Sequence, residues 1–275
     1  MGCGEVAVDR RMVDRSAAER HWRGAGTVWR RRSTAAEGKG RTPVGDNRFV
    51  RIVSLVPSAT ETLIAWGVPP VACTRFCEQP GIPTVGGTKN PDVEAIVRLA
   101  PDLVVLDEEE NRREDHDALV AAGVPVHVLA IRCVDDVARQ LPGFARRIGI
   151  TWDPPLLGAA MPTRASVVVP IWRRPWMLLG RPTYGESMLA HVGLALRSPS
   201  GSGPYPQVKL DEMAALGADL VLAPSEPYPF SERHRTELEV VAPVVLQEGK
   251  DLFWWGIRTG PALARLAVLA ERIGA

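Results

Sequence analysis

The chain has 275 residues, of which 45% are hydrophobic and 24% are charged, and its formal net charge is +1. These values are ordinary for a globular protein and leave room for two modest α/β domains. The near-neutral charge excludes a strong field that would attract nucleic acid, and no stretch has the roughly 18 apolar residues of a membrane-spanning helix, so we expect neither partner.

The first 49 residues are predicted to be a disordered basic extension, because they contain few apolar residues and include Arg30, Arg31 and Arg32. They lack the continuous apolar core of a secretory signal, and Cys3 follows no apolar run. We therefore expect a cytoplasmic protein, with a periplasmic location as the alternative if the N-terminus is mis-assigned. The four cysteines show no disulfide-framework spacing, which favours free thiols.

From Arg51 onward, strands are predicted to alternate with helices. Residues 51–57 are predicted to form a buried parallel strand, and residues 58–67 a helix that Ser58 or Thr60 opens and Gly67 ends, with Glu61 at capping-box spacing from Ser58. The first half continues with a strand at 70–76, a helix opened at Asn90 or Pro91, a strand at 101–107, a helix at 112–122 and a strand at 124–130. This alternation predicts βαβ units around a mainly parallel sheet.

The second half follows the same pattern. We expect a strand at 166–172, helices at 183–193 and 209–217, strands at 218–224 and 242–247, and an amphipathic helix at 260–274. Between the halves, residues 135–150 are predicted to be a bridging helix. Because Pro142 lies inside it, and an internal proline costs about 3 kcal/mol, this helix is expected to be short and kinked or split.

An internal repeat relates the two halves. The segment Val93–Leu106 aligns without gaps on Leu210–Ala223, which pairs Glu94 with Asp211. Such self-similarity predicts a duplicated architecture, with two similar α/β lobes and a ligand cleft between them. The predicted domains are an extension at 1–49, a first lobe at 50–134, a bridging helix and linker at 135–165, and a second lobe at 166–275.

Candidate ligand-binding side chains follow the predicted strands. In the first lobe they are Arg75, Phe76, Cys77, Glu109, Glu110 and Asn111. In the second lobe six aromatic residues are expected in loops after strands: Trp172, Trp176, Tyr228, Phe230, Trp254 and Trp255. Such a group of aromatic rings favours a large flat ligand held by stacking. The alternatives are that the rings pack loops against helices and that the acidic run at 107–110 is a solvated loop.

Catalytic and metal-binding motifs are not found in the sequence. The five histidines lack metal-site spacing, and Cys77 is the one candidate soft ligand, with structural burial as the alternative. The motifs of serine hydrolases, phosphate-binding loops and dinucleotide-binding folds are absent. We expect a non-enzyme that requires no cofactor, although a reaction at Cys77 or Glu110 with a cofactor in the cleft remains an alternative.

Several segments resemble helical-backbone metal receptors, the class III substrate-binding proteins of ABC importers. They are RIVSLVPSATETLIAWG, TRFCEQP, VGGTKNPDVEAIVRLAPDLVVLDEEENRRED and PIWRRPWMLLGRPTYGESMLAHVGL. The resemblance covers residue 50 to the C-terminus, and the first-lobe segments are closest to the cobalamin-binding branch.

This resemblance implies two Rossmann-like lobes joined by one rigid helix, in a monomer that binds cobalamin, another corrinoid or a ferric chelate between the lobes. It also implies that Glu94 and Asp211 dock onto arginines of an ABC permease. Because no export signal is visible, a cytoplasmic carrier or sensor of the same fold, docking another partner, is the alternative.

Overall fold

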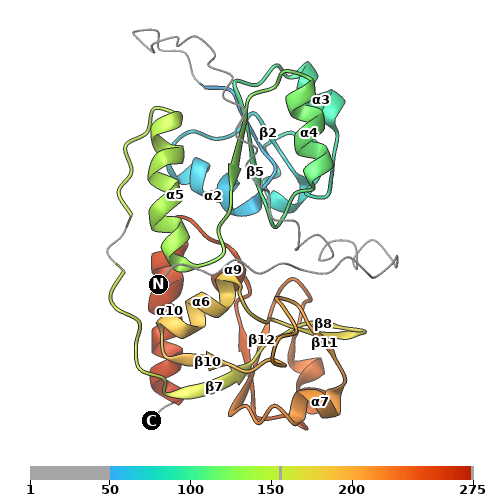
Figure 1. Cartoon of the computed structure of the whole chain (residues 1–275), viewed down its shortest axis with the longest axis vertical. Coiled ribbons are helices and arrows are strands. Elements are labelled where there is room, and N and C mark those ends of the chain that lie inside the picture. Colours follow the sequence, from blue (N-terminus) through green and yellow to red (C-terminus); the bar gives the residue numbers. More distant parts are fainter. Residues whose placement is uncertain (1–49, 155–156, 274–275) are drawn as a thin grey trace. The chain divides into compact units, whose positions relative to one another are not determined.

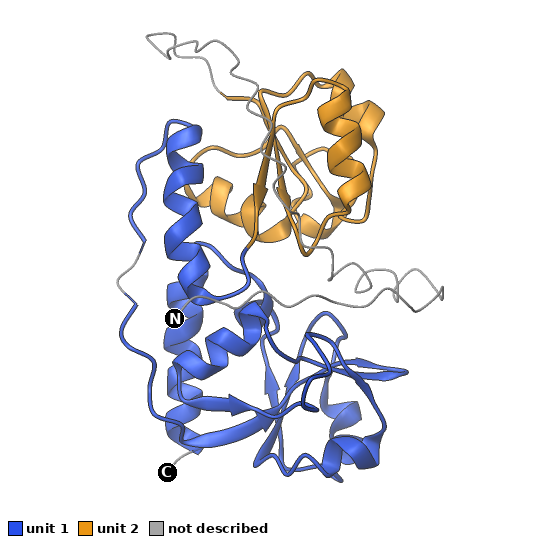
Figure 2. Ribbon diagram, in the orientation of Figure 1, with its two compact units in different colours: residues 1–5, 131–275 blue, residues 6–130 orange. Residues whose placement is uncertain are grey.

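The computed structural model describes residues 50–154 and 157–273. They belong to two compact units that Figure 2 draws in different colours. We call residues 50–130 the N-lobe and the described residues from Ile131 onward the C-lobe. The predicted basic extension, residues 1–49, lies outside the described residues.

The N-lobe is built on a parallel sheet with the strand order β2-β1-β5-β6. Its strands β1 (Ile52–Ser54) and β5 (Leu103–Asp107) are fully buried, which is usual for a parallel sheet covered on both faces. The outer strands are β2 (Ala72–Cys73) and β6 (Val126–Leu129). In Figure 1, α3 (Val93–Arg98) and α4 (Arg113–Ala121) lie on one side of the sheet and α2 (Pro57–Ala65) on the other.

Two helix starts in the N-lobe differ from the prediction. The predicted cap of Ser58 and Glu61 is wrong, since Pro57 is the first residue of α2 and Val56 precedes it; proline suits that position because its missing N–H needs no partner there. Helix α3 does not open at Asn90 or Pro91, because the Asp92 carboxylate accepts a hydrogen bond from the Ala95 N–H at 2.8 Å and caps it. The prediction that Gly67 ends α2 is confirmed by its φ of 75°.

The segment between β2 and α3 is more irregular than predicted. The expected strand at 70–76 is reduced to β2, and Arg75–Cys77 forms a single 3₁₀ turn, η1. A short hairpin follows, in which β3 (Gly86–Gly87) pairs antiparallel with β4 (Asn90–Pro91). The turn η1 and this hairpin include exposed residues, among them Arg75, Phe76 and Asn90.

The C-lobe contains two sheets (Figure 1). The central one is parallel, with the order β10-β7-β12-β13, and consists of β7 (Ala165–Val168), β10 (Leu194–Leu196), β12 (Leu220–Pro224) and β13 (Val244–Gln247). The second is antiparallel, with the order β11-β9-β8, and consists of β8 (Pro170–Arg173), β9 (Trp176–Leu178) and β11 (Gln207–Val208). The strand predicted at 166–172 is therefore two strands, separated at Val169, that belong to different sheets.

The helices of the C-lobe vary in length. The longer ones are α5 (Val134–Arg147), α6 (Tyr184–His191) and α10 (Thr259–Ile273), and α10 confirms the helix predicted at 260–274. The short ones are α7 (Leu210–Ala214), the 3₁₀ turn η2 (Glu232–His234), α8 (Arg235–Leu238) and α9 (Lys250–Phe253). Helices α6, α9 and α10 pack against one another.

Helix α5 runs as one element through Pro142, so the expectation that this proline splits the helix is wrong. Its buried residues recur at three- and four-residue spacing and form one face, which includes Val137, Leu141 and Phe144. Burying this face offsets the roughly 3 kcal/mol that an internal proline costs. At the N-terminus of α5, the Val134 N–H donates to the Ser187 hydroxyl of α6 at 3.0 Å.

The internal repeat is visible in the hydrogen bonding of the two lobes. Under the alignment that pairs Glu94 with Asp211, β5 falls on β12 residue for residue, and both parallel sheets have the same order. In the N-lobe, the Asp102 carboxylate accepts a hydrogen bond from the Arg51 N–H at 2.8 Å. In the C-lobe, the aligned Asp219 accepts one from the Ser166 N–H at 2.7 Å. The duplicated architecture predicted from the sequence is thereby confirmed.

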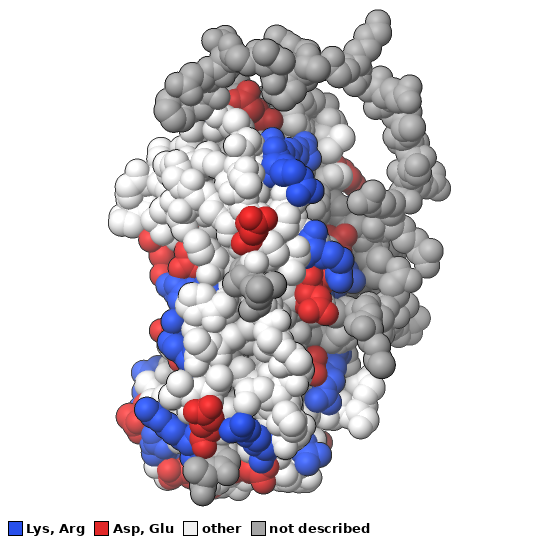
Figure 3. All heavy atoms as spheres, turned by 90° about the vertical axis from the view of Figure 1, so that its left-hand side faces the viewer, with Lys and Arg blue, Asp and Glu red and all other residues white. Residues whose placement is uncertain are grey.

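Charges are interspersed on the described part of the face that Figure 3 shows, where acidic and basic side chains lie among broad uncharged areas. This mixture agrees with the formal net charge of +1. Within residues 50–154 and 157–273, none of the helices has the length and apolar character needed to cross a membrane.

Candidate functional site

In the N-lobe, polar side chains gather where β1 and β5 end. The buried Asn111 joins three segments there: its amide nitrogen donates to the carbonyls of Leu55 and Thr88 at 3.2 and 2.9 Å, and its amide oxygen accepts from the Asp107 N–H at 2.8 Å. Asn111 thus fixes the loop after β5 rather than presenting a free amide. The predicted carboxylates Glu109 and Glu110 are half-buried on this loop.

Burial and neighbouring charges shift two pKa values beside Asn111. Desolvation raises the pKa of Glu110 well above its ordinary range, and the nearby Asp107 carboxylate raises it further. Desolvation also lowers the pKa of Lys89, although Glu110 and Glu109 oppose this shift. The Lys89 ammonium donates to the Glu109 carbonyl oxygen at 2.6 Å. The cluster therefore contains a carboxyl group that keeps its proton to a higher pH than usual.

The turn η1 presents two predicted residues to solvent. The Arg75 guanidinium lies 4.7 Å from the centre of the Phe76 ring, and Phe76 is 38% exposed. Both side chains rest on Gly87 of the hairpin, where an added Cβ would lie 3.0 Å from each of them. An added Cβ would also lie 2.6 Å from the Asn90 side-chain oxygen, so a larger residue at this position would displace these side chains. The result is an exposed cation–π pair on a defined platform.

Cys77, the third predicted residue of this group, is buried. Its sulfur accepts a hydrogen bond from the Thr60 hydroxyl at 3.1 Å and lies 3.3 Å from the Thr74 hydroxyl. It also contacts the buried Cys73 thiol, whose hydrogen bond is the largest cause lowering the pKa of Cys77. Among the described residues, no group of three or more His, Cys, Asp or Glu side chains could hold a metal ion.

In the C-lobe, four of the six predicted aromatic residues form one cluster. Trp172 meets Tyr228 edge to face at 5.4 Å, Trp176 stacks on Phe230 at 6.2 Å, and Tyr228 and Phe230 are 4.8 Å apart, centre to centre. Phe230 is buried in the core of the lobe, whereas Trp172, Trp176 and Tyr228 are half-buried. The cluster therefore combines an anchored base with partly exposed rings.

The positions of the two tryptophans correct the prediction that they lie in loops. Trp172 is in β8 and Trp176 in β9, in the antiparallel sheet that follows the break at Val169. Tryptophan favours the pleated surface of a strand, and in β8 the buried Pro170 and Ile171 are followed by the half-buried Trp172 and Arg173.

His234 of η2 completes the cluster and was not predicted. Its ring lies 5.5 Å from both Tyr228 and Phe230. Burial lowers the pKa of His234, and the nearby guanidinium groups of Arg233 and Arg173 lower it further. The contacts of this imidazole with two aromatic rings depend on how the segment after β12 folds, which the sequence does not show.

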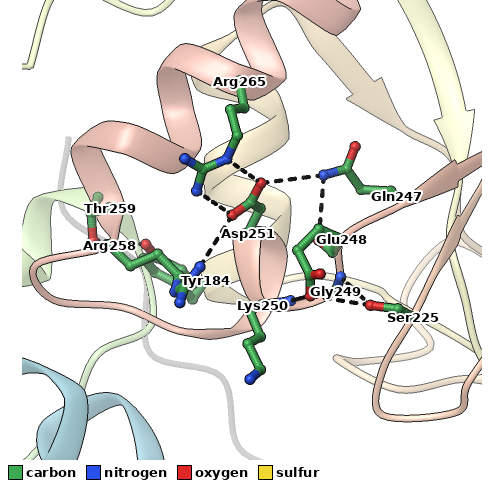
Figure 4. A network of polar contacts seen from close by, with 10 residues as sticks. All are labelled: Tyr184, Ser225, Gln247, Glu248, Gly249, Lys250, Asp251, Arg258, Thr259 and Arg265. Atoms are coloured by element: carbon green, nitrogen blue, oxygen red, sulfur yellow. Dashed lines mark hydrogen bonds and ion pairs between the residues drawn. The ribbon is translucent and has the colours of Figure 1, made fainter.

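The remaining predicted aromatic residues, Trp254 and Trp255, lie apart from this cluster and are 9% and 3% exposed. They follow α9, which a polar network holds in place (Figure 4). The buried Asp251 accepts two hydrogen bonds from Arg265 of α10, at 2.8 and 2.6 Å. The Lys250 ammonium lies 4.6 Å from the centre of the Trp254 ring. This arrangement fits the alternative that these two rings pack a loop against helices.

The two predicted docking acids occupy equivalent and exposed positions. Glu94 lies in the first turn of α3 and Asp211 in the first turn of α7. An acid there interacts favourably with the helix dipole. Glu94 is 90% exposed at its side chain and lies 3.7 Å from Arg98, so both carboxylates are accessible to a partner.

Comparison with known proteins finds similarity to periplasmic binding proteins. A family model described as periplasmic binding protein matches residues 52–149. The periplasmic vitamin B12-binding protein of Vibrio cholerae has a similar structure, with a TM-score of 0.67, 16% identity, and coverage of 81% of this chain and 97% of that one. The periplasmic haem-binding protein of Roseiflexus sp. RS-1 has a TM-score of 0.66 and 21% identity, with coverage of 82% of this chain and 99% of that one. A periplasmic haem-binding protein of Pseudomonas aeruginosa has a TM-score of 0.66 and 18% identity, with coverage of 80% of this chain and 91% of that one.

The prediction of a cytoplasmic protein is wrong, because the matched family and these three structures are periplasmic binding proteins. That prediction was based on residues 1–49, which the family match does not include. The same proteins are named for binding rather than catalysis, which supports the expectation of a non-enzyme. Residues 52–149 thus match the periplasmic binding protein family, and the chain shares the two-lobed α/β fold of these structures, in agreement with its resemblance to helical-backbone metal receptors.

Proposed function

We propose that this chain is the ligand receptor of an ABC importer and that its ligand is a metal chelate with a broad, partly apolar ring, such as a corrinoid or haem. The observation that carries the proposal is the cluster of Trp172, Trp176 and Tyr228, whose rings stay partly exposed above the buried Phe230. Grouped apolar surface of this kind marks binding sites, and flat rings suit a flat ligand. The ligand position between the lobes remains a prediction from the resemblance.

The N-lobe supplies polar groups that suit the periphery of such a ligand. The exposed Arg75 guanidinium, stacked on Phe76, can donate paired hydrogen bonds to a carboxylate such as a haem propionate. Glu110, whose pKa is raised, can donate a hydrogen bond to an amide oxygen such as those around a corrin ring. Glu109 is half-buried on the same loop. Arg75 favours haem and the protonated Glu110 favours a corrinoid, so variants of these two residues can distinguish the two ligands.

Calorimetric titration with cobalamin, cobinamide, haem and a ferric siderophore, with absorbance spectra, tests the proposal. We expect one ring-shaped ligand to bind and Trp172→Ala to weaken it by about tenfold or more, the order of one lost aromatic contact. Val240→Ala is the matched control, because Val240 is 64% exposed on the same lobe and outside the cluster. If none of the four binds, or if both variants bind like the unchanged protein, the proposed ligand class is wrong.

The two ligand types make opposite demands on the N-lobe. A haem receptor should lose affinity with Arg75→Gln and tolerate Glu110→Gln, because the propionates need a cation. A corrinoid receptor should tolerate Arg75→Gln better, because its peripheral amides are neutral. Equal effects of both variants on one ligand would argue against this assignment of the polar groups.

We also propose that Glu94 and Asp211 dock on an ABC permease. The support is their exposure and equivalent placement in the first turns of α3 and α7. Replacing both with arginine should abolish ligand-stimulated transport in membranes containing the cognate permease while ligand affinity is unchanged. Glu114→Arg is the control, because Glu114 is an exposed acid in the first turn of α4. Equal loss with the control would reject specific docking.

A further inference from the structure

Two cysteines enclose the exposed turn of the N-lobe. Cys73 is the last residue of β2 and Cys77 is the last residue of η1. Between them lie Arg75 and Phe76, the exposed pair assigned above to ligand binding. Both cysteines are buried and free, with exposed fractions of 0% and 1%. A bond between their sulfur atoms would therefore close a small ring around this pair.

The side chains of Cys73 and Cys77 interact, as the shift that each causes in the pKa of the other indicates, and they flank one short turn in which the Cys77 N–H donates to the Thr74 carbonyl. The backbone fixes both ends of the segment: the Cys73 N–H donates to the Pro83 carbonyl at 2.9 Å and the Cys77 N–H to the Thr74 carbonyl at 3.1 Å. The Thr60 hydroxyl holds the Cys77 sulfur from helix α2 at 3.1 Å. The contact is thus a property of the folded lobe and does not depend on a flexible loop.

Hydrogen bonds shift the pKa values of the two thiols in opposite directions. The Cys73 thiol and the Thr60 and Thr74 hydroxyls lower the pKa of Cys77, whereas the same pairing raises the pKa of Cys73. The thiolate form is the nucleophile in disulfide exchange. Cys77 is therefore the attacking sulfur, and Cys73 holds its proton until the second step.

We propose that Cys73 and Cys77 form a reversible disulfide and that the redox state of this pair regulates ligand affinity at the Arg75–Phe76 turn. The regulatory part rests on the proposed function, whereas the disulfide itself does not. The matched proteins are periplasmic, and the periplasm is an oxidising compartment in which disulfides persist. The free thiols expected for a cytoplasmic protein lose their rationale with the corrected location.

The reaction is a thiol–disulfide exchange with a disulfide oxidant, RSSR. The Cys77 thiolate attacks one sulfur of RSSR, which forms a mixed disulfide and releases RS⁻. Cys73 then loses its proton and attacks the Cys77 sulfur, which forms the Cys73–Cys77 bond and releases the second RS⁻. The two protein thiols lose two electrons and two protons, and the oxidant becomes two RSH molecules.

Access to the buried pair requires a small local opening. The turn η1 contains three residues, Arg75 and Phe76 are exposed, and Glu78 adopts a left-handed φ of 54°, which is unfavourable for a non-glycine residue. Such a segment opens at a lower free energy than the whole lobe unfolds. Oxidation should consequently be slower in the folded protein than during refolding.

The disulfide is tested in the full chain carrying Cys3→Ser and Cys133→Ser. Cys133 caps α5, and serine is a preferred residue at that position. After refolding in excess oxidised glutathione, acid quenching and alkylation, we expect a mass lower by two hydrogen atoms, no alkylation, and reversal by reduced glutathione. Two alkylated cysteines, or separate glutathione adducts on Cys73 and Cys77, would overturn the disulfide.

The regulatory part is tested by titrating the oxidised and reduced forms with cobalamin and haem. A change of at least about fivefold in Kd, the lower range of usual coupling between sites, supports it, and the Cys73→Ser, Cys77→Ser double variant should show no redox dependence. Equal affinities of the two forms would overturn it. A disulfide that forms in a protein that binds neither ligand would reject the proposed function and the regulation with it, and leave the disulfide established.

Discussion

Glu110 is a single residue whose ionisation opposes folding. Its folded pKa is raised, so its contribution to stability is present below its unfolded pKa and is lost as the pH rises through the folded pKa. Glu110→Gln should therefore raise the free energy of unfolding at pH 7 by roughly 1 kcal/mol, an ordinary size for one substitution. Urea unfolding measures this, with Glu114→Gln on the exposed face of α4 as the control. A less stable Glu110→Gln protein would contradict it.

His234 acts with the opposite sign. Its folded pKa is lowered by burial and by Arg233 and Arg173, with Glu237 opposing, so its contribution is present above the unfolded pKa of about 6.5 and lost as the pH falls. The unchanged protein should lose stability between about pH 7 and pH 5, and His234→Gln should lose less. Urea midpoints at both pH values, compared between the two proteins, isolate this residue from Glu110. Parallel changes in both proteins would exclude the role.

The sequence could place candidate side chains after strands, but it could not show how far each is buried. Asn111 is engaged in three hydrogen bonds and Phe230 lies in the core, because both are set by contacts with distant segments. The exposed Arg75 and Phe76 follow from their position in a short turn. Burial depends on which elements pack together, and a single sequence contains that information only indirectly.

Two glycines, one inside helix α5 and one just after it, allow a prediction about the stability of this helix. Gly143 lies inside the helix, and an added Cβ would meet nothing closer than Arg146 at 3.9 Å. Gly143→Ala should stabilise the protein by about 1 kcal/mol, because alanine loses less backbone entropy in a helix. Gly149 follows α5 with a φ of 79°, so Gly149→Ala should destabilise it. Thermal or urea unfolding of both variants should move in opposite directions, and a shared direction would contradict this account.

Elements with a clear period were predictable, and those set by pairing were not. The buried parallel strands and α10 follow from apolar runs and helical periodicity. The hairpin of β8 and β9 was missed, because Pro170 continues an apolar run and only pairing with a second strand shows where one strand ends. The continuity of helix α5 through Pro142 was not predicted either, because burial of one face of the helix outweighs the local effect of this proline.

At the scale of the whole molecule, ligand binding should add to stability in proportion to affinity. A ligand present at 100 times its Kd raises the free energy of unfolding by about 2.7 kcal/mol if only the folded state binds. We expect this shift with the bound corrinoid or haem, a smaller one for Trp172→Ala at the same concentration, and none with the ligands that do not bind. Urea unfolding with and without ligand measures it. An identical shift in Trp172→Ala would show that the aromatic cluster is not involved.

The fold class was predictable from the whole sequence because the alternation of strands and helices repeats in both halves. The cellular location was not predictable, since it was inferred from residues outside the matched segment. Ligand identity depends on the exposed side chains of the loops, which periodicity does not constrain.

The aspartates at the entry of β5 and β12 have an evolutionary consequence. The two lobes share their strand order, an aspartate bonded to the neighbouring strand, and an acidic residue at the same place on the preceding helix. The fusion of two copies of one ancestral half would produce this pattern. After such a fusion, each copy can change its loops independently while its core is retained. The N-lobe now carries cysteines and carboxylates after its strands, and the C-lobe carries tryptophans in its second sheet, as independent change of the two copies would allow.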